Sequence, residues 1–250
     1  MANFLSRAKS WAAKNKLLGP QAFLKYVIFT YLDALNEQSD EFVFKGGNLL
    51  WTYIQTPRAT VDLDLSTLEE DDDSEIKAIL RSVKASDGIH FKLDKFQSIE
   101  QKDKRGASVS ISYKTDSGAS NKFDIDIVYA TPIDFQSISS PIDNSAEIKA
   151  ASIENIIADK LNTVQRFKAG NTRIKDFDDI WRISNSDQEI NTKKLTSLLK
   201  KRKISPTLDK NWINEEMEAS WAKHRKRYKD LPENLSTLFE IVNTWLKTKI

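Results

Sequence analysis

The sequence predicts an α+β protein in which a mixed core over residues 1–145 precedes a helical region over residues 146–250. Two observations predict this division. Apolar and polar residues alternate in several segments between residues 89 and 129, which is the pattern of strands with one buried face. From about residue 146 onward, apolar residues recur at helical spacing almost to the end of the sequence. A chain of 250 residues is long enough for one large domain or two modest ones.

The first part of the chain combines helices and short strands. Two helices are expected at 4–17 and 20–38, because Gly19-Pro20 is a helix stop followed by a proline suited to a helix start. The next expected elements are, in order, a strand at 42–45, a short helix from Asn48 to Ile54, a strand at 60–66, an acidic run from Glu69 to Asp73, and a helix from about Ser74 to Ser86.

Three strands with alternating patterns follow, at 89–93, 109–113 and 123–127. The polar stretch 116–121 is expected to turn the last two into a hairpin. Further on, Ser152 can cap a helix from Ile153 to about Phe167. A second amphipathic helix is expected over 173–181.

Composition limits the chemistry. The chain has no cysteine and only two histidines, which excludes thiolate metal sites and makes a histidine-built site improbable. Carboxylates, lysines, arginines and hydroxyls remain, and carboxylate ligands favour a hard cation such as Mg²⁺. No apolar run is long enough to span a membrane, and the first residues resemble a helix and not a signal peptide, so we expect a cytoplasmic protein.

The most informative feature is a cluster in the first part of the chain. Lys45-Gly46-Gly47-Asn48 ends a short apolar strand and opens a helix, so its main-chain amides can cradle phosphates. It is followed by Arg58-x-Thr60-x-Asp62-x-Asp64, in which the two acids point to one face of a strand. Together these residues are the minimum set for binding a nucleotide with a divalent cation.

A third acid is expected on another strand. Asp124 and Asp126 lie on the face opposite three apolar residues. This face can simply be exposed, as in many antiparallel sheets. Alternatively, one acid joins Asp62 and Asp64 around metal ions, because three convergent carboxylates repel one another without cations. We favour Asp126, which is nearer the C-terminal end of its strand.

A lysine and an acid of the second part complete the candidate residues. Lys160 lies on the apolar stripe of its helix, where it either extends to the edge or reaches an anion. In the following helix, Asp176 falls at the margin of the apolar face and is a plausible partner for Lys160. Asp179 is expected on the far side of that helix, and Asp178 on the opposite margin.

Together these residues resemble the AbiEii/AbiGii-type toxin family, minimal nucleotidyltransferases of type IV toxin–antitoxin and abortive-infection systems. The resemblance runs from Phe44 to Trp181 and rests on the ordered set of motifs. These are Lys45-Gly46-Gly47, the segment Arg58–Leu65, Asp126 in its strand, and the segment Glu154–Asp179.

The resemblance implies a DNA-polymerase-β-like nucleotidyltransferase core with a mixed sheet. It implies that Asp62 and Asp64 bind metal, that Asp126 is the third acid, and that Lys160 and Asp176 are a later active-site pair. The family usually has Ser or Thr after the diglycine, whereas this chain has Asn48. An asparagine can donate to a phosphate oxygen but cannot replace a hydroxyl.

The expected reaction is transfer of a nucleotide from an NTP, with Mg²⁺ or Mn²⁺ held by Asp62, Asp64 and Asp126. Lys45, Gly46, Gly47, Asn48, Arg58, Thr60 and Lys160 are the expected nucleotide-binding residues, and Asp64, Asp126, Lys160 and Asp176 the expected catalytic ones. The acceptor is a tRNA or other RNA, or a protein hydroxyl, and a cognate antitoxin is an expected partner. A magnesium-dependent nuclease and a nucleotide-binding module without turnover are the alternatives.

Basic clusters at 193–194, 200–203 and 223–227, with Trp212, Trp221 and Tyr228 among them, could bind RNA. A solvated helical face with core aromatics explains the same pattern equally well.

Overall fold

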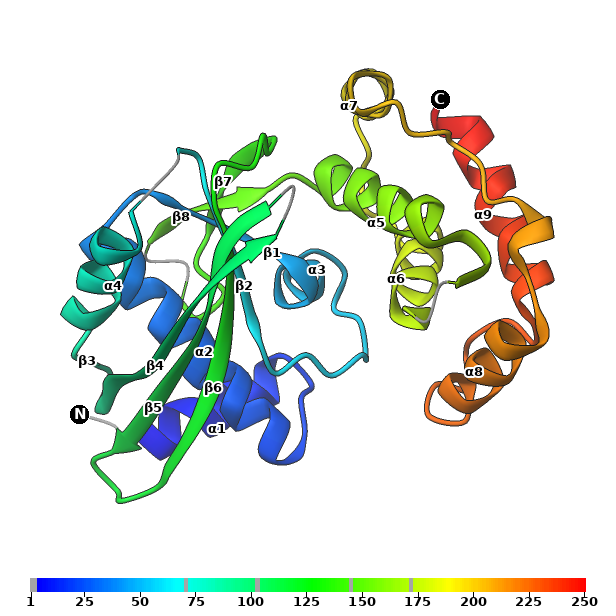
Figure 1. The fold of residues 1–250 in the computed structure, drawn as a ribbon. Helices are drawn as coiled ribbons and strands as arrows, with labels where there is room; N and C mark the ends of the chain where they lie inside the picture. Colours follow the sequence, from blue (N-terminus) through cyan, green and yellow to red (C-terminus); the bar gives the residue numbers. More distant parts are fainter. Residues whose placement is uncertain (1–3, 70–71, 102–103, 144–145, 171–172) are drawn as a thin grey trace. The chain divides into compact units, whose positions relative to one another are not determined.

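The computed structural model describes residues 4–69, 72–101, 104–143, 146–170 and 173–250 (Figure 1). The chain divides into two compact units, each described below by itself. The first consists of Met1–Thr52 and Arg58–Ala151, and the second of Tyr53–Pro57 and Ser152–Ile250. Within the described residues, no helix is long and apolar enough to cross a lipid bilayer.

The first unit is built on one mixed sheet. In the described part of the chain its strands are β1 (Phe42–Lys45), β2 (Leu63–Thr67), β3 (Ala85–Ser86), β4 (Ile89–Gln101), β5 (Lys104–Thr115), β6 (Ser120–Val128), β7 (Phe135–Ser139) and β8 (Glu147–Ala151). They lie in the order β3-β4-β5-β6-β2-β1-β8-β7. β2 runs parallel to β6 and antiparallel to β1, and β1 in turn runs parallel to β8.

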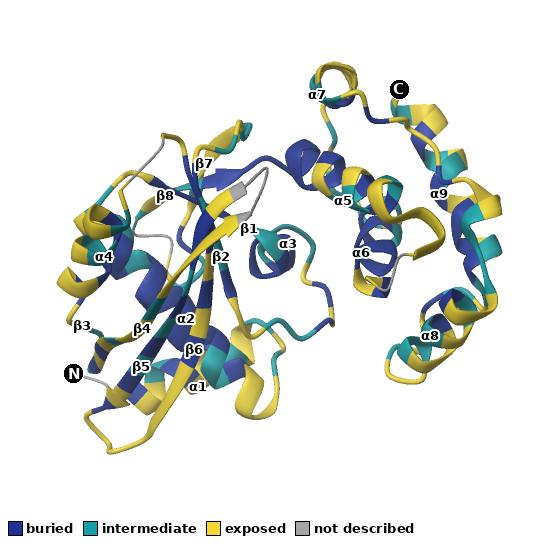
Figure 2. Ribbon diagram, viewed as in Figure 1, coloured by how far each residue is buried: buried dark blue, intermediate teal, exposed yellow. Residues whose placement is uncertain are grey.

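Helices cover one face of this sheet. They are α1 (Phe4–Lys14), α2 (Gly19–Gln38), α3 (Gly46–Ile54) and α4 (Asp73–Ser82). α2 lies across the strands (Figure 1), and the fully buried Tyr31 packs edge-on against Phe91 and Phe123. α1 lies on α2, where Trp11 contacts the rings of Tyr26 and Phe29. The acids of β6 face away from this core and are exposed, whereas Phe123, Ile125 and Ile127 are buried (Figure 2).

The second unit is helical. Its helices are α5 (Ile153–Phe167), α6 (Ile174–Ser184), α7 (Thr192–Arg202), α8 (Glu215–Arg225) and α9 (Leu235–Lys249), with short 3₁₀ turns at Lys168–Gly170 and Lys210–Trp212. Ser152 caps α5 by accepting a hydrogen bond from the main-chain N–H of Asn155, as expected. α6 is the central helix of this unit, because α5, α8 and α9 all pack against it. The rings of Phe177 and Phe239 meet there, with centroids 5.3 Å apart.

The structure corrects several expected boundaries. The strands expected at 89–93 and 109–113 are parts of the longer β4 and β5, which pair antiparallel with each other, and β5 also pairs antiparallel with β6, as expected. The helical pattern expected from residue 146 begins only at Ile153, because Glu147–Ala151 is the strand β8. Two alanines give β8 little strand propensity of its own, so its conformation follows from pairing with β1 and β7. The expected limit at residue 145, and Glu70 and Asp71 of the acidic run, lie outside the described residues.

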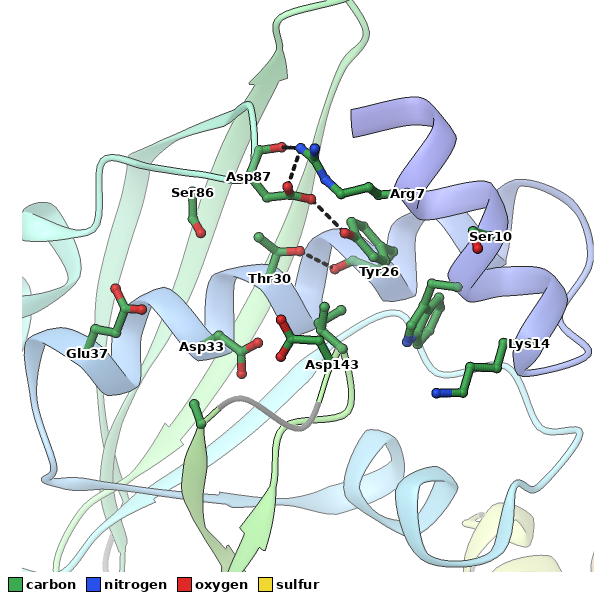
Figure 3. A pocket seen from close by; sticks show the side chains of 13 residues that line it. Arg7, Ser10, Lys14, Tyr26, Thr30, Asp33, Glu37, Ser86, Asp87 and Asp143 are labelled. Atoms are coloured by element: carbon green, nitrogen blue, oxygen red, sulfur yellow. Dashed lines mark hydrogen bonds and ion pairs between the residues drawn. The ribbon is translucent and has the colours of Figure 1, made fainter. Parts of the chain in front are cut away.

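A pocket of about 420 Å³ lies between α1, α2, residues 86–87 and the three residues Ile142, Asp143 and Ala146 (Figure 3). Arg7 and the Tyr26 hydroxyl both bind Asp87 on one side of it. On the other side lies Asp33, which accepts a hydrogen bond from Ser140. None of the residues predicted to form the active site is among the described residues that line this pocket.

The carboxyl group of Asp33 is half-buried in this pocket. Burial raises the pKa of Asp33 to about 6, aided by the charges of Asp143 and Glu37 and opposed by the hydrogen bond from Ser140. The folded chain therefore holds this proton to a higher pH than the unfolded chain. It follows that the favourable contribution of protonated Asp33 to the free energy of unfolding is lost as pH rises from about 4 to about 6.

We predict that Asp33→Asn raises the free energy of unfolding at pH 8 by about 1–2 kcal/mol, allowing for partial solvent screening. The asparagine cannot ionise, so the cost of a buried charge above pH 6 disappears. At pH 4 the two proteins should differ little. Urea unfolding at both pH values measures this, and an equal difference at pH 4 and pH 8 would contradict the assignment.

Candidate active site

The diglycine forms the junction between β1 and α3. β1 ends at Lys45 and α3 begins at Gly46, whose φ is +74°. A Cβ atom at Gly46 would lie 1.8 Å from Oδ2 of Asp64. The carboxylate of Asp64 therefore lies directly against the main chain of this glycine, and any side chain at Gly46 would displace it.

Two polar side chains lie over the next glycine. A Cβ atom at Gly47 would lie 2.5 Å from Nη2 of Arg58 and 2.7 Å from Oγ1 of Thr60. Arg58 is buried, and Thr60 Oγ1 is a buried oxygen without a hydrogen-bond partner in the described part of the chain. A guanidinium and a hydroxyl therefore meet at the N-terminus of α3, where main-chain N–H groups favour an anion.

The acids of neighbouring strands share one face of the sheet. Asp64 of β2 is the register partner of Asp126 of β6, and these strands are parallel. Asp126 is exposed and Asp64 is half-buried. Asp124 lies one pleat away, with Ser110 as its partner on the other side. The register therefore brings Asp126, and not Asp124, directly beside Asp64. Asp62 is exposed and immediately precedes β2.

The donor set suits a cation that arrives with a nucleotide. Within the described residues, no group of three His, Asp or Glu side chains is close enough to form a complete metal site. Asp64 and Asp126 nevertheless offer oxygen donors from adjacent strands, with Asp62 two residues before Asp64. Mg²⁺ commonly binds one or two carboxylates and takes its other ligands from water and substrate phosphates. The residues present fit that mode of binding.

Asn48 has contacts within the protein at both ends of its amide. Its side chain is fully buried, and Nδ2 donates to the main-chain oxygen of Asp62 over 2.7 Å. Oδ1 accepts a hydrogen bond from the ammonium of Lys25 in α2. The expected contact of Asn48 with a phosphate stays a prediction. Lys25 was not among the expected residues, although a lysine three and four residues before the apolar Ile28 and Phe29 could have indicated a buried role.

In the second unit, Lys160 is held by two acids. Its Nζ lies 2.7 Å from Oδ1 of Asp176 and 2.6 Å from Oδ2 of Asp179. The expected contact with Asp176 is therefore present. Burial by itself would lower the pKa of Lys160, but the charges of Asp179 and Asp176 outweigh it and raise the pKa. The ammonium thus stays charged while its side chain keeps an exposed fraction of 15%.

Two acids of α6 that were expected outside its apolar face are nevertheless buried. Asp179 is fully buried and binds Lys160. Asp178 is also fully buried, where it binds Nε of Arg182 at 2.6 Å and Nε2 of His224 at 2.8 Å. The reason is that α6 packs against three helices, so more than one of its faces is buried. A helical wheel with a single apolar face cannot represent this.

Comparisons with known proteins show the family of the chain and structures with a similar fold. A family model described as nucleotidyl transferase AbiEii toxin, type IV TA system, matches residues 30–243. The structure is similar to JHP933 from Helicobacter pylori, with a TM-score of 0.56 and 17% identity over 93% of both chains. It is also similar to an H. pylori protein assigned as a nucleotidyltransferase, with a TM-score of 0.55 and 18% identity over 93% of this chain and 96% of the other. At these identities the likeness concerns the fold alone. No curated protein matches the sequence.

We predict that Lys160→Met lowers the free energy of unfolding by about 3–5 kcal/mol, because it removes the buried ammonium that lies between the carboxylates of Asp176 and Asp179. Urea unfolding measures the loss, and adding Asp176→Asn and Asp179→Asn to the same chain should restore part of it. Lys210→Met is the matched control, since Lys210 forms an exposed ion pair with Glu240 in the same unit. It should cost less than about 1 kcal/mol. Equal losses for the two lysine variants would contradict the buried triad.

Proposed function

Because the chain belongs to the family of AbiEii nucleotidyl transferase toxins of type IV toxin–antitoxin systems, we propose that it transfers a nucleotide from an NTP to a hydroxyl group of an RNA or a protein. The observation that carries the proposal is the meeting of the glycine turn with Asp64 and Asp126 on adjacent strands. On the same grounds we propose that the first unit is a nucleotidyltransferase core of the DNA-polymerase-β kind.

The glycine turn is the proposed triphosphate site. Gly46 and Gly47 let main-chain N–H groups approach the phosphates without a side chain between them. Arg58, above Gly47, offsets phosphate charge, and Lys45 is a second cation at the end of β1. The buried hydroxyl of Thr60 supplies a hydrogen-bond donor that is otherwise unused among the described residues.

The acids Asp62, Asp64 and Asp126 are the proposed ligands for Mg²⁺ or Mn²⁺ entering with the nucleotide. When bound, such an ion neutralises phosphate charge and lowers the pKa of an attacking hydroxyl. The contact of Asp64 with Gly46 keeps one carboxylate beside the triphosphate site. The family resemblance alone makes Lys160 and Asp176 proposed active-site residues, and within the second unit Asp176 and Asp179 hold the ammonium of Lys160 in one position.

The proposed acceptor is the end of a tRNA or another RNA. Support comes from exposed basic residues of the second unit, which are Lys193, Lys200, Lys201, Lys203, Lys223, Lys226 and Arg227. These can bind a phosphate backbone. Trp221 is fully buried and unavailable for stacking on bases, whereas Trp212 and Tyr228 are half-buried. As a member of a toxin–antitoxin family, the chain is also proposed to bind a cognate antitoxin.

We predict that the protein, incubated with labelled NTPs, Mg²⁺ and total RNA, transfers label to RNA. Asp64→Asn should lower this transfer about 100-fold or more, since it removes a carboxylate charge at the reacting phosphates. Asp124→Asn is the matched control on β6, because that acid is exposed and not beside Asp64.

Two results would contradict the proposal. Shortened RNA without label would indicate a nuclease, and metal-dependent NTP binding without labelled RNA or protein would indicate a module without turnover. Intact-mass measurement of tRNA after the reaction identifies any added nucleotides directly.

We predict that Gly46→Ala also abolishes transfer, because its Cβ would overlap the carboxylate of Asp64. Gly19→Ala is the matched control. Its φ of +73° is nearly that of Gly46, but no other atom lies within 4 Å of the added Cβ. Both variants therefore bear a similar backbone cost of about 1 kcal/mol, and only Gly46→Ala should lose activity. Loss of activity in both would assign the effect to backbone strain alone.

A further inference from the structure

Lys25 is a buried lysine that has no acidic partner among the residues that the structure describes. It lies in the first half of α2 with a residue exposure of 5%, and its ammonium lies 4.7 Å from the centre of the Trp51 ring and 5.5 Å from that of Phe29. Among the residues that the structure describes, no carboxylate forms an ion pair with it. Burial, and then the charge of nearby Arg58, lower the pKa of Lys25 to about 7. A buried ammonium without a carboxylate partner lowers the free energy of unfolding. The contacts of this ammonium therefore indicate its role.

The ammonium binds the side-chain oxygen of Asn48. A lysine ammonium has only donors, so it fixes which end of the Asn48 amide faces α2. The NH₂ end must then face the other way, where it donates to the main-chain oxygen of Asp62 over 2.7 Å. Without the ammonium of Lys25, neither of these two contacts would prevent the Asn48 amide from turning over. Its side-chain oxygen would then face the main-chain oxygen of Asp62.

Asp62 immediately precedes β2, which carries Asp64. Both residues are proposed metal ligands, and Asp62 itself is exposed, so its main chain needs an anchor from inside the protein. We propose that Lys25 is a positioning residue, which acts through Asn48 to fix the main chain of Asp62 and with it the acids that receive the metal-bound nucleotide. This inference rests on the proposed function.

Two variants separate positioning from stability. Lys25→Met keeps the length of the side chain but removes the ammonium. Relief from a buried charge opposes the loss of the donor to Asn48, so the melting temperature should change little. Asn48→Asp gives Lys25 a carboxylate partner, which favours folding, but it replaces the donor that faces Asp62 by an acceptor. Both variants should lower kcat for nucleotide transfer by about 10- to 100-fold, because small displacements of reacting groups have effects of that size. KM for the NTP should change less, since the glycine turn and Arg58 remain.

The matched control is Lys149→Met, a half-buried lysine of β8 that pairs with Asp40 away from these residues. It should keep the kcat of the unchanged protein. Wild-type kcat in both folded test variants, Lys25→Met and Asn48→Asp, would overturn the inference, as would a loss of activity that merely follows a loss of folded protein.

Hydrogen exchange supplies a readout that needs no activity. Main-chain amides of residues 59–65 should exchange faster in Lys25→Met and Asn48→Asp than in the unchanged protein. In Lys149→Met they should exchange at the same rate as in the unchanged protein. If the unchanged protein transfers no nucleotide, the proposed function fails, and this exchange alone decides whether Lys25 anchors Asp62. Unchanged exchange over 59–65 in both variants would overturn the anchoring role.

Discussion

The parallel pairing of β2 with β6 is the constraint from which the candidate site follows. β2 also pairs with β1 on its other side, so Asp64 lies between Lys45 and Asp126 in one row across three strands. Lys45, at one end of this row, is the last residue of β1, and the glycine turn follows it. At that turn the carboxylate of Asp64 lies against Gly46. A shift of β2 by one residue would turn Asp64 into the apolar core, because successive side chains of a strand point to opposite faces. The buried Leu63 and Leu65 therefore fix the position of the acid between them.

Two buried lysines, Lys160 and Lys25, differ in the groups that compensate their positive charge. Lys160 is matched by Asp176 and Asp179, which more than offset the cost of burial and keep it charged. Lys25 has aromatic rings and an amide oxygen but no carboxylate among the described residues, and Arg58 opposes it further. The first arrangement stabilises the packing of α5 on α6. The second has a cost in stability, and its effect is to orient one amide below the candidate site.

Asn48 links these observations. The resemblance to the AbiEii family placed a hydroxyl residue at this position and suggested a direct role in binding phosphate. In the structure, the side-chain amide of Asn48 contacts both the ammonium of Lys25 and the main-chain oxygen of Asp62. Asn48 of α3 is thereby connected to Lys25 of α2. The polar atom left without a partner near the glycine turn is instead the hydroxyl of Thr60, within the described residues.

The sequence by itself determined the elements whose signals are local. Alternation predicted β6 and the exposed row of Asp124 and Asp126, the diglycine marked the start of α3, and Ser152 marked the start of α5. Only the tertiary structure decided which acids meet. The choice between Asp124 and Asp126 depends on strand register, the buried position of Asp179 depends on three helices around α6, and the role of Lys25 depends on a contact between α2 and α3. Each of these is set by residues distant in sequence, and a pattern within one segment carries no information about its neighbours in space.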